Sequence, residues 1–375
     1  MRALALRCDV TYLYFVDPVD APITKEDLPF CRDVVGIPKP GSYGTAKLIQ
    51  GVIGRWPLPI LNYTSPEMSA AVERLASTGR FDLIHLDSIH MIRYGQLPAL
   101  HGARIVYNWH NIESEAMRRF GETVPSLPRR WYAGMTAAKL AALEQGMLRE
   151  AFGHVVCSDR ERTQLRRSAP AARIQVVENG VDTQYFAGAE ESGPPGQQIV
   201  FVGTMDYYPN VEAATSFANR IWPRVRERLP EMRLIIVGAN PTPAVSALPA
   251  IPGVTVTGTV PDVRPYYRNA LAAIVPLRTG GGTRLKILEA MAAGVPVVST
   301  VLGAEGLAVT PGSDILIADA DDAQHWIDHL NALAQIPIRK NQIRAALDLV
   351  RTRYDWEIVG QTLNDTYAAW LREAG

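Results

Sequence analysis

The stretch TGGGTRLKILEAMAAGVPVVST, residues 279–300, decides the interpretation of this chain. The preceding AAIVPL (272–277) is a short apolar run typical of a buried strand, so the three glycines form a strand-to-helix turn and the helix begins near Thr283. The first turn of a helix has unpaired N–H groups and a partial positive charge. Glycines there let an anion approach the backbone closely. The stretch therefore predicts an anion site at a helix N-terminus.

Helical spacing separates the side chains of this segment into two faces. Leu285, Leu288 and Ala292 are expected on the core face, while Gly282, Lys286 and Glu289 share another face. A ligand with its phosphates on the glycines would meet Lys286 and then Glu289, whose carboxylate can accept hydrogen bonds from two vicinal hydroxyls. This order predicts a nucleotide. The alternative is that Lys286 and Glu289 pair with each other and the glycines only form a turn. The spacing matches neither the P-loop nor G-x-G-x-x-G, which disfavours an NTPase or a dinucleotide-binding fold.

Apolar, β-branched runs alternate with longer helical stretches along the whole chain, which predicts parallel sheets covered on both faces in a doubly wound α/β fold. A length of 375 residues fits two such domains. The Gly/Pro-rich stretch 188–198 marks the boundary region. We expect two Rossmann-like domains facing a cleft, an N-terminal one over 1–182 and a C-terminal one over 183–355.

Composition excludes several classes of protein. Lys+Arg and Asp+Glu are both 38, so no global field recruits nucleic acid. Three scattered cysteines argue against a disulfide framework. No apolar run reaches the length of a transmembrane helix, and Arg7 and Asp9 interrupt any signal peptide. These observations predict a cytoplasmic protein.

The charge balance is uneven over residues 116–173, which contain eleven Lys/Arg and five Asp/Glu, a net charge of +6. Two interpretations stay open. The segment can be a solvated helical face, which is what charge runs usually are, or it can contact an anionic membrane surface or acceptor.

The segment GGGTRLKILEAMAAGVPVVSTVLGAEGL resembles the signature of family 4 glycosyltransferases, which are retaining enzymes with the GT-B fold. Four further segments resemble parts of the same family: YNWHNIESEAMRR (107–119), VVENGVD (176–182), VTVTGTVPDV (254–263) and YDWEIVGQTLNDTYAAWL (354–371). The resemblance implies a sugar transfer from a nucleotide diphosphate donor to a hydroxyl group of a glycan or lipid-linked acceptor. It also implies that a terminal helix over 356–375 packs back on the first domain.

The resemblance also implies roles for individual residues. His110 would face the donor sugar, Glu289 would hold the ribose, and backbone groups near Val260 would read the base. The donor diphosphate would lie on the glycine turn, near Gly203 and the cations of the helix. The residues expected to bind the donor are Gly203, Val260, Gly281, Gly282, Thr283, Arg284, Lys286 and Glu289.

Three departures from the family pattern stand out. The first of the two glutamates that the family places eight residues apart falls on Gly281. The Arg and Lys usual after the first strand of the second domain are replaced by GTMDYYPN (203–210), so Arg284 and Lys286 would neutralise the diphosphate. A subset of the family, including enzymes of bacterial exopolysaccharide clusters, shares both features. The opening RALALRCDVTYLYF resembles the tail of the family's first helix and its second strand, so the first strand and its Gly-rich loop are expected to be missing.

We expect no metal or other cofactor. Asp319 and Asp321 match a D-x-D pattern, but their place between a strand and a helix predicts a helix cap. The His85–His90 segment lacks further ligands at sensible spacing. The sequence therefore predicts a metal-independent, retaining glycosyltransferase. The alternatives are a nucleotide-sugar binder without catalysis and a nucleotide-sugar 2-epimerase of similar architecture.

Overall fold

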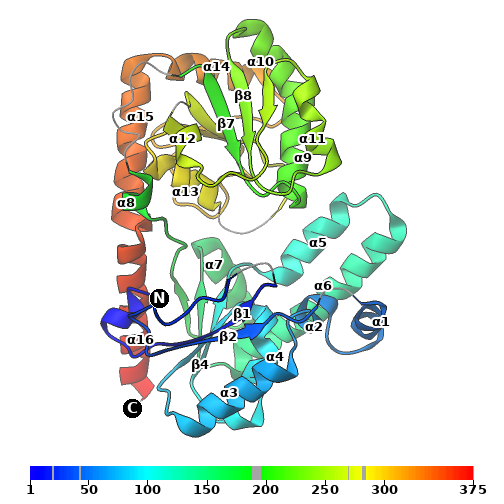
Figure 1. Ribbon diagram of the computed structural model, residues 1–375, viewed down its shortest axis with the longest axis vertical. Helices are drawn as coiled ribbons and strands as arrows, with labels where there is room; N and C mark the ends of the chain where they lie inside the picture. The colour runs from blue at the N-terminus through cyan, green and yellow to red at the C-terminus, as the bar shows by residue number, and fades with distance from the viewer. Residues whose placement is uncertain (19–20, 42–43, 188–195, 269, 281–283, 375) are drawn as a thin grey trace. The chain divides into compact units, whose positions relative to one another are not determined.

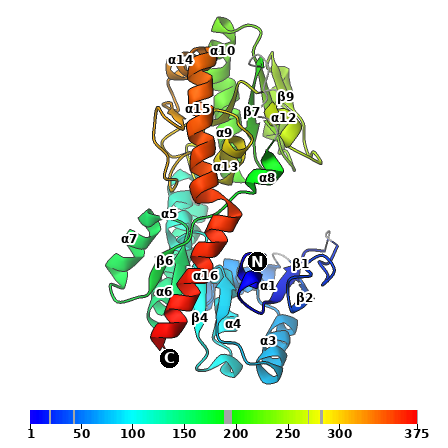
Figure 2. The same cartoon turned by 90° about the vertical axis from the view of Figure 1, so that its left-hand side faces the viewer.

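The computed structural model describes residues 1–18, 21–41, 44–187, 196–268, 270–280 and 284–374. The chain forms two compact units, one made of Met1–Glu178 with Gly360–Gly375 and the other of Asn179–Val359. Both are parallel α/β structures, as the alternation of apolar runs and helical stretches predicts (Figures 1 and 2). None of the helices in the described ranges is long and apolar enough to cross a membrane.

Unit 1 contains a two-stranded and a four-stranded parallel sheet, in the orders β1-β2 and β3-β4-β5-β6. Its strands are β1 (Thr11–Val16), β2 (Asp33–Pro38), β3 (Ile84–Asp87), β4 (Ile105–Trp109), β5 (Gly153–Val156) and β6 (Ile174–Val176). Its helices are α1 (Thr45–Ile53), α2 (Leu58–Leu61), α3 (Pro66–Thr78), α4 (Ile92–Gly95), α5 (Glu113–Thr123), α6 (Leu127–Glu150) and α7 (Asp159–Ser168), with short 3-10 turns at Leu4–Leu6, Ile89–Met91 and Pro98–Leu100.

Unit 2 contains one six-stranded parallel sheet in the order β12-β11-β10-β7-β8-β9. Its strands are β7 (Gln198–Val202), β8 (Arg233–Val237), β9 (Val254–Val256), β10 (Ala272–Val275), β11 (Val297–Ser299) and β12 (Leu316–Ile317). Its helices are α8 (Thr183–Phe186), α9 (Tyr208–Ser216), α10 (Trp222–Arg228), α11 (Pro243–Ser246), α12 (Arg264–Arg268), α13 (Leu285–Ala292), α14 (Ala323–Leu333) and α15 (Ile336–Leu349), with π-helical turns at Phe217–Ile221 and Val350–Tyr354 and a 3-10 turn at Leu248–Ala250.

In the sheet of unit 2 the strand order reverses between β7 and β10, which are paired neighbours. Figure 1 shows α9 and α11 on one side of β7 and β8 and α12 and α13 on the other. In open sheets of this kind ligands bind outside the carboxyl ends of the strands, at the point where the strand order reverses. The segments that follow β7 and β10 are therefore the first place to look for a site.

The core of unit 2 explains why α13 forms where it does. Ile287, Leu288 and Met291 are fully buried, and the neighbouring strand β10 is apolar and buried throughout. The helix begins at Leu285, with Arg284 at the N-cap position, two residues after Thr283, which lies outside the described residues. Leu285 was predicted on the core face and this is wrong, because at the first helical position its side chain is 41% exposed.

The last helix, α16 (Trp356–Ala374), contains the boundary between the two units, and its residues from Gly360 onward belong to unit 1. Tyr367 and Trp370 are buried there. Trp370 packs so closely on Gly153 that a Cβ at that glycine would lie 2.5 Å from the indole ring. Asn364 and Asp365 contact the N-terminal segment through hydrogen bonds to Ala3 and Arg7.

Candidate functional site

Two of the segments predicted to bind the donor adjoin the reversal of strand order in unit 2. Gly203 directly follows β7, and the segment after β10 leads into α13. Gly281, Gly282 and Thr283 lie outside the described residues, so their predicted backbone contacts to a diphosphate stay predictions. Arg284, Lys286 and Glu289 are described, and their surroundings show what this end of the sheet can bind.

Lys286 extends from α13 toward the end of β7. Its Nζ donates a hydrogen bond of 2.6 Å to Asn210 Oδ1 on α9 and lies 4.7 Å from the centre of the Phe201 ring. Burial, together with the nearby charge of Arg284, lowers the pKa of Lys286 to about 7. Among the described residues no ion pair joins Lys286 to Glu289, so the alternative in which these two side chains pair is not what the structure shows.

The residue after β7 has to be glycine, because Lys286 and Asn210 lie close to its backbone. A Cβ on Gly203 would lie 2.7 Å from Asn210 Nδ2 and 2.8 Å from Lys286 Nζ. Gly203 O in turn lies where a Cβ on Gly238 would need to be, at 1.7 Å. Only glycine fits where backbone and polar groups approach so closely. Asn210 was missed by sequence reasoning, although it stands in GTMDYYPN, the segment where the family's Arg and Lys were sought.

Arg284 is the second cation of this cluster. Its side chain is only 5% exposed, and its charge is close enough to Lys286 to lower that residue's pKa. The turn before it includes Gly280, whose φ of +105° favours glycine. Two cations held near each other in a poorly solvated place repel one another. An anion bound between them would relieve that repulsion, so the arrangement fits a phosphate-bearing ligand.

Glu289 follows Lys286 by three residues on α13 and is partly buried. Burial raises the pKa of Glu289, and burial together with the charge of Glu289 raises the pKa of Tyr267. A carboxylate held partly desolvated gains most from hydroxyl donors. Val260 is partly buried and packs against the core of unit 2. The ribose contact of Glu289 and the base contact near Val260 stay predictions.

The residue just before the glycine turn is anchored by ion pairs. Arg278 Nη1 and Nη2 lie 2.7 and 3.0 Å from the two carboxylate oxygens of Asp321, and its Nε lies 3.2 Å from Glu212 Oε1. Arg220 also pairs with Asp321, at 2.8 Å. These contacts tie the end of β10 to α9 and to the start of α14.

The same contacts correct the interpretation of the D-x-D pattern. Asp319 and Asp321 were expected to cap the following helix, but the cap of α14 is Asp322, whose side chain accepts from the backbone N–H of Gln324. Asp319 instead accepts a hydrogen bond from the backbone N–H of Asp321. The helix starts one residue later than the pattern suggested, and the Arg278 side chain takes the Asp321 carboxylate.

In unit 1 the carboxyl ends of β3 and β4 bring His110 and Asp87 together. The two strands are parallel neighbours in which Asp87 lies opposite Asn108. His110 Nε2 lies 2.9 Å from Asp87 Oδ1, and Asn108 Nδ2 donates to the same oxygen at 2.8 Å. The hydrogen bond to Asp87 raises the pKa of His110, although burial opposes it. Asp87 was missed as a partner because nothing in the sequence links it to His110.

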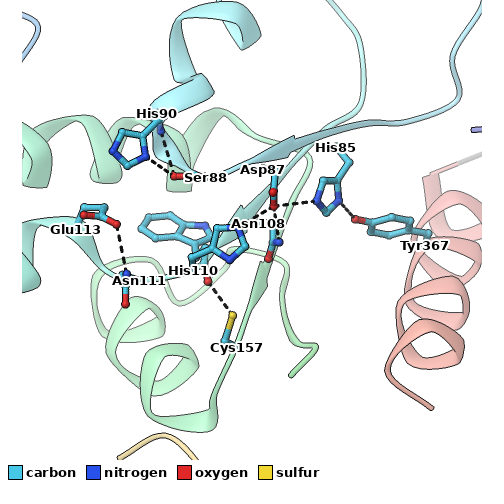
Figure 3. A network of polar contacts seen from close by, with 11 residues as sticks. His85, Asp87, Ser88, His90, Asn108, His110, Asn111, Glu113, Cys157 and Tyr367 are labelled. Atoms are coloured by element: carbon cyan, nitrogen blue, oxygen red, sulfur yellow. Dashed lines mark hydrogen bonds and ion pairs between the residues drawn. The ribbon is translucent and has the colours of Figure 1, made fainter. Parts of the chain in front are cut away.

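Two further side chains extend this network away from His110 (Figure 3). His85 Nε2 lies 3.8 Å from Asp87 Oδ1, and His85 Nδ1 is hydrogen-bonded to Tyr367 Oη on α16. Partial desolvation alone would raise the pKa of Asp87, but its hydrogen bonds to His110 and Asn108 and the nearby His85 outweigh this effect and hold that pKa well below its usual range. The C-terminal helix is thereby linked through His85 and Asp87 to His110.

Carboxylates from two helices also act on the charge of His110. Glu113 stands at the start of α5 and Glu161 in the first turn of α7, and the charge of each raises the pKa of His110. Burial raises the pKa of Glu113, and it raises the pKa of Glu161 to about 7. These charges all favour the imidazolium form of His110, which can donate hydrogen bonds from both ring nitrogens.

The His85–His90 segment has other partners than a metal in this structure. His85 and Asp87 belong to the network of His110, and His90 Nδ1 lies 2.6 Å from Ser88 Oγ (Figure 3). Within the described ranges no group of three or more His, Cys, Asp or Glu side chains could hold a metal ion.

Comparisons with known proteins agree with this architecture. Residues 8–185 match the family model described as Glycosyltransferase Family 4, and residues 196–335 match the one described as Glycosyl transferases group 1. A phosphatidyl-myo-inositol mannosyltransferase of Mycobacterium leprae is 24% identical over 315 residues, covering 81% of this chain and 77% of the relative. A D-inositol 3-phosphate glycosyltransferase of Pseudarthrobacter chlorophenolicus is 24% identical over 351 residues, covering 85% and 78%.

Solved structures share the fold over the whole chain. Sucrose-phosphate synthase from Thermosynechococcus elongatus superposes with a TM-score of 0.75 at 19% identity, covering 100% of this chain and 92% of that one. Anabaena HepE, solved in complex with UDP and glucose, gives a TM-score of 0.65 at 13% identity, covering 96% and 100%. The fold is GT-B, built from two Rossmann-like domains. The chain is a glycosyltransferase of the family 4 type.

Proposed function

We propose that this glycosyltransferase moves a sugar from a nucleoside diphosphate donor to a hydroxyl acceptor, with retention at the anomeric carbon and without a metal. The observation that carries the proposal is the pair of Lys286 and Arg284 beside Gly203 and Asn210, at the reversal of strand order in unit 2. A helix N-terminus with two buried cations suits a diphosphate better than an uncharged ligand.

The chemistry follows from where charge develops. The bond between the anomeric carbon and the diphosphate oxygen breaks, and its electron pair goes to that oxygen. The acceptor oxygen forms the new bond on the same face of the sugar, and its proton goes to the leaving phosphate oxygen. Preorganised cations in a poorly solvated place stabilise the leaving group without reorganisation. Arg284 and Lys286 are proposed for this task, Glu289 for the ribose hydroxyls and the backbone near Val260 for the base.

His110 is proposed to contact the donor sugar. Its partner Asp87 and the nearby Glu113 and Glu161 favour its charged form, which donates to sugar oxygens and offsets charge on the phosphate. The acceptor is proposed to be a glycan or a lipid-linked sugar. The resemblance of the glycine segment to enzymes of exopolysaccharide clusters supports a role in the synthesis of bacterial surface or exported polysaccharide.

A screen of UDP-, GDP- and ADP-sugars for thermal stabilisation tests the donor, because a ligand that binds only the folded state raises the melting temperature. The stabilising donor is then incubated with candidate acceptors, and the anomeric configuration of the product is read by NMR. A product of inverted configuration would contradict retention.

The same incubation separates the rival functions. An epimerase would convert the nucleotide-sugar without an acceptor, and a non-catalytic binder would be stabilised by a donor yet transfer nothing to any acceptor. Stabilisation by none of the three nucleotide classes would remove the support for a donor site on α13.

A further inference from the structure

Helix α1 exposes large apolar side chains along much of its length. Leu48, Ile49 and Ile53 are 47%, 59% and 80% exposed in a helix of nine residues. Ile49 and Ile53 are four residues apart and therefore share one face. Exposed apolar side chains grouped in this way mark a surface that contacts a partner or a membrane.

The first turns of α6 repeat this pattern. Leu127 is 74% exposed and Trp131 is 63% exposed, and they too are four residues apart. Trp combines a large apolar body with a polar N–H, which suits the boundary between water and lipid. We call Leu48, Ile49, Ile53, Leu127 and Trp131 the α1/α6 apolar set.

One lysine holds the two helices together. Lys139 on α6 donates hydrogen bonds to the carbonyl oxygens of Gly51, Val52 and Gly54 at 2.8, 2.6 and 2.7 Å. These carbonyls lie at the C-terminal end of α1, where a cation also interacts favourably with the helix dipole. Figure 1 shows α1 beside α6. The exposed face of α1 is therefore presented by a fixed helix and not by a loose loop.

The two segments that carry the apolar set contain positive and no negative side chains. Residues 34–66 contain Lys39, Lys47 and Arg55 and no Asp or Glu, and residues 123–143 contain Arg129, Arg130 and Lys139 and no Asp or Glu. Arg55, Arg129 and Arg130 are exposed. Some nearby cations have acidic partners: Arg119 and Arg160 pair with Glu115, Arg162 pairs with Asp159, and Lys39 pairs with Asp17. Arg55, Arg129 and Arg130 thus place exposed positive charge in the same two segments as the exposed apolar side chains.

We propose that α1 and the first turns of α6 dock unit 1 onto an anionic phospholipid surface. Apolar side chains among exposed arginines match what an interfacial helix needs, namely burial at the headgroup boundary and attraction to anionic lipid. A second copy of the same surface is a poorer occupant, because two basic faces repel. This docking would hold the enzyme where lipid-linked acceptors are found.

Flotation with lipid vesicles tests the docking on the full chain. Wild type is expected to float with phosphatidylcholine vesicles containing phosphatidylglycerol, to float poorly with phosphatidylcholine alone, and to be released by salt. The double variants Ile49→Ser/Ile53→Ser and Leu127→Ser/Trp131→Ser should each bind about tenfold more weakly, because buried apolar area is lost. Arg129→Gln/Arg130→Gln should weaken binding to a similar degree, about tenfold, and reduce its salt dependence.

A matched control comes from unit 2, where Val301 and Ile336 are 76% and 54% exposed. Val301→Ser/Ile336→Ser should leave vesicle binding unchanged. All variants replace exposed side chains, so their melting temperatures should stay near that of wild type, which shows that they fold.

Three outcomes would overturn the proposal. Wild type can fail to bind either vesicle, the control can lose as much binding as the α1/α6 variants, or the variants can instead dissolve a dimer seen by sedimentation velocity, which would assign the surface to a second copy. Vesicle binding needs no donor, so these outcomes are independent of the nucleotide screen that tests the proposed function.

Discussion

Lys286 Nζ donates a hydrogen bond of 2.6 Å to Asn210 Oδ1, although 76 residues separate the two in the chain. The contact joins the helix after β10 to the helix after β7, and the absence of a side chain on Gly203 makes room for it. It also holds an amine whose pKa burial lowers to about 7. An amine so placed is ready to gain a proton when an anion arrives.

The first prediction is that a nucleoside diphosphate takes up a proton at Lys286 when it binds. The bound anion favours the charged amine, so the pKa of Lys286 rises and a proton enters from solvent at about pH 8. Isothermal titration calorimetry in buffers of different ionisation enthalpy measures the uptake. In Lys286→Arg the positive charge is kept, but the arginine is already protonated before the ligand binds. Proton uptake should therefore disappear while nucleotide binding persists. Equal uptake by both proteins would place the titrating group elsewhere.

The second prediction concerns Glu289. Its side chain is partly buried, and burial of the charged carboxylate is unfavourable, as the raised pKa of Glu289 indicates. Glu289→Ala should therefore remove donor binding while the melting temperature stays within a few degrees of wild type. The measurement is thermal stabilisation by the donor found in the nucleotide screen. A variant that melts much lower yet still binds the donor would show that Glu289 supports the fold and not the ribose.

The third prediction separates the charge of Arg284 from its bulk. Charge-assisted hydrogen bonds contribute about 1.5 to 3 kcal/mol, so Arg284→Ala should slow turnover by about ten- to a hundredfold. Arg284→Lys keeps the charge but loses the bidentate geometry of the guanidinium, so its turnover should lie between those of the alanine variant and wild type. Affinity for the nucleoside diphosphate should fall, whereas affinity for the free nucleoside should barely change.

Arg284 is buried, so its loss can also weaken binding by changing the shape of the site. Equal losses for nucleoside and nucleoside diphosphate would show that Arg284 shapes the site and does not meet the phosphates. The diphosphate site at the top of α13 would then have to be abandoned.

The fourth prediction concerns the pH dependence of turnover. Asp87 raises the pKa of His110, so the charged imidazole persists to higher pH than an isolated histidine would allow. Asp87→Asn should move the alkaline limb of the kcat/KM profile toward lower pH, with a small loss at about pH 6 and a loss of about tenfold or more at about pH 8. Because the side chains of His110 and Asp87 are 42% and 64% exposed, solvent limits the stability gained from the pair.

Tyr367 provides a subtler change in the same network. Tyr367→Phe removes the hydroxyl bonded to His85 and should shift the profile in the same direction by less than Asp87→Asn. Tyr354→Phe is the control, since it removes a buried hydroxyl that accepts from Ala308 N in unit 2. If both tyrosine variants alter the profile alike, Tyr367 acts only on stability.

The fifth prediction is that turnover survives EDTA. The proposed stabilisation of the leaving diphosphate comes from Arg284, Lys286 and the helix N-terminus, which need no metal. The assay compares initial rates with and without chelator. Loss of activity that manganese or magnesium restores would mean that Asp319 and Asp321, or the His85–His90 segment, had been misinterpreted.

Local pattern predicted the parts of the fold whose signals are local. The runs that became β7, β10 and β11 are almost entirely apolar, which is typical of short buried parallel strands. The strand β2 went unrecognised because Gly36 and Pro38 interrupt its apolar run. Only its pairing with β1 makes it a strand, and a Cβ at Gly36 would meet the Tyr14 side chain there.

By itself, the sequence determined the α/β class, the helix that follows the glycine turn, and the choice of Arg284, Lys286 and Glu289 as candidates, because helical spacing and strand composition act over a few residues. The tertiary structure alone decided which partners these side chains have. Asn210 reaches Lys286, and Asp87 reaches His110, because parallel neighbouring strands bring their carboxyl ends to one edge of a sheet. Which face of α1 is exposed likewise depends on a tertiary contact, because Lys139 holds the end of α1 against α6. Contacts between distant segments depend on sheet order and packing, and no spacing along the chain encodes them.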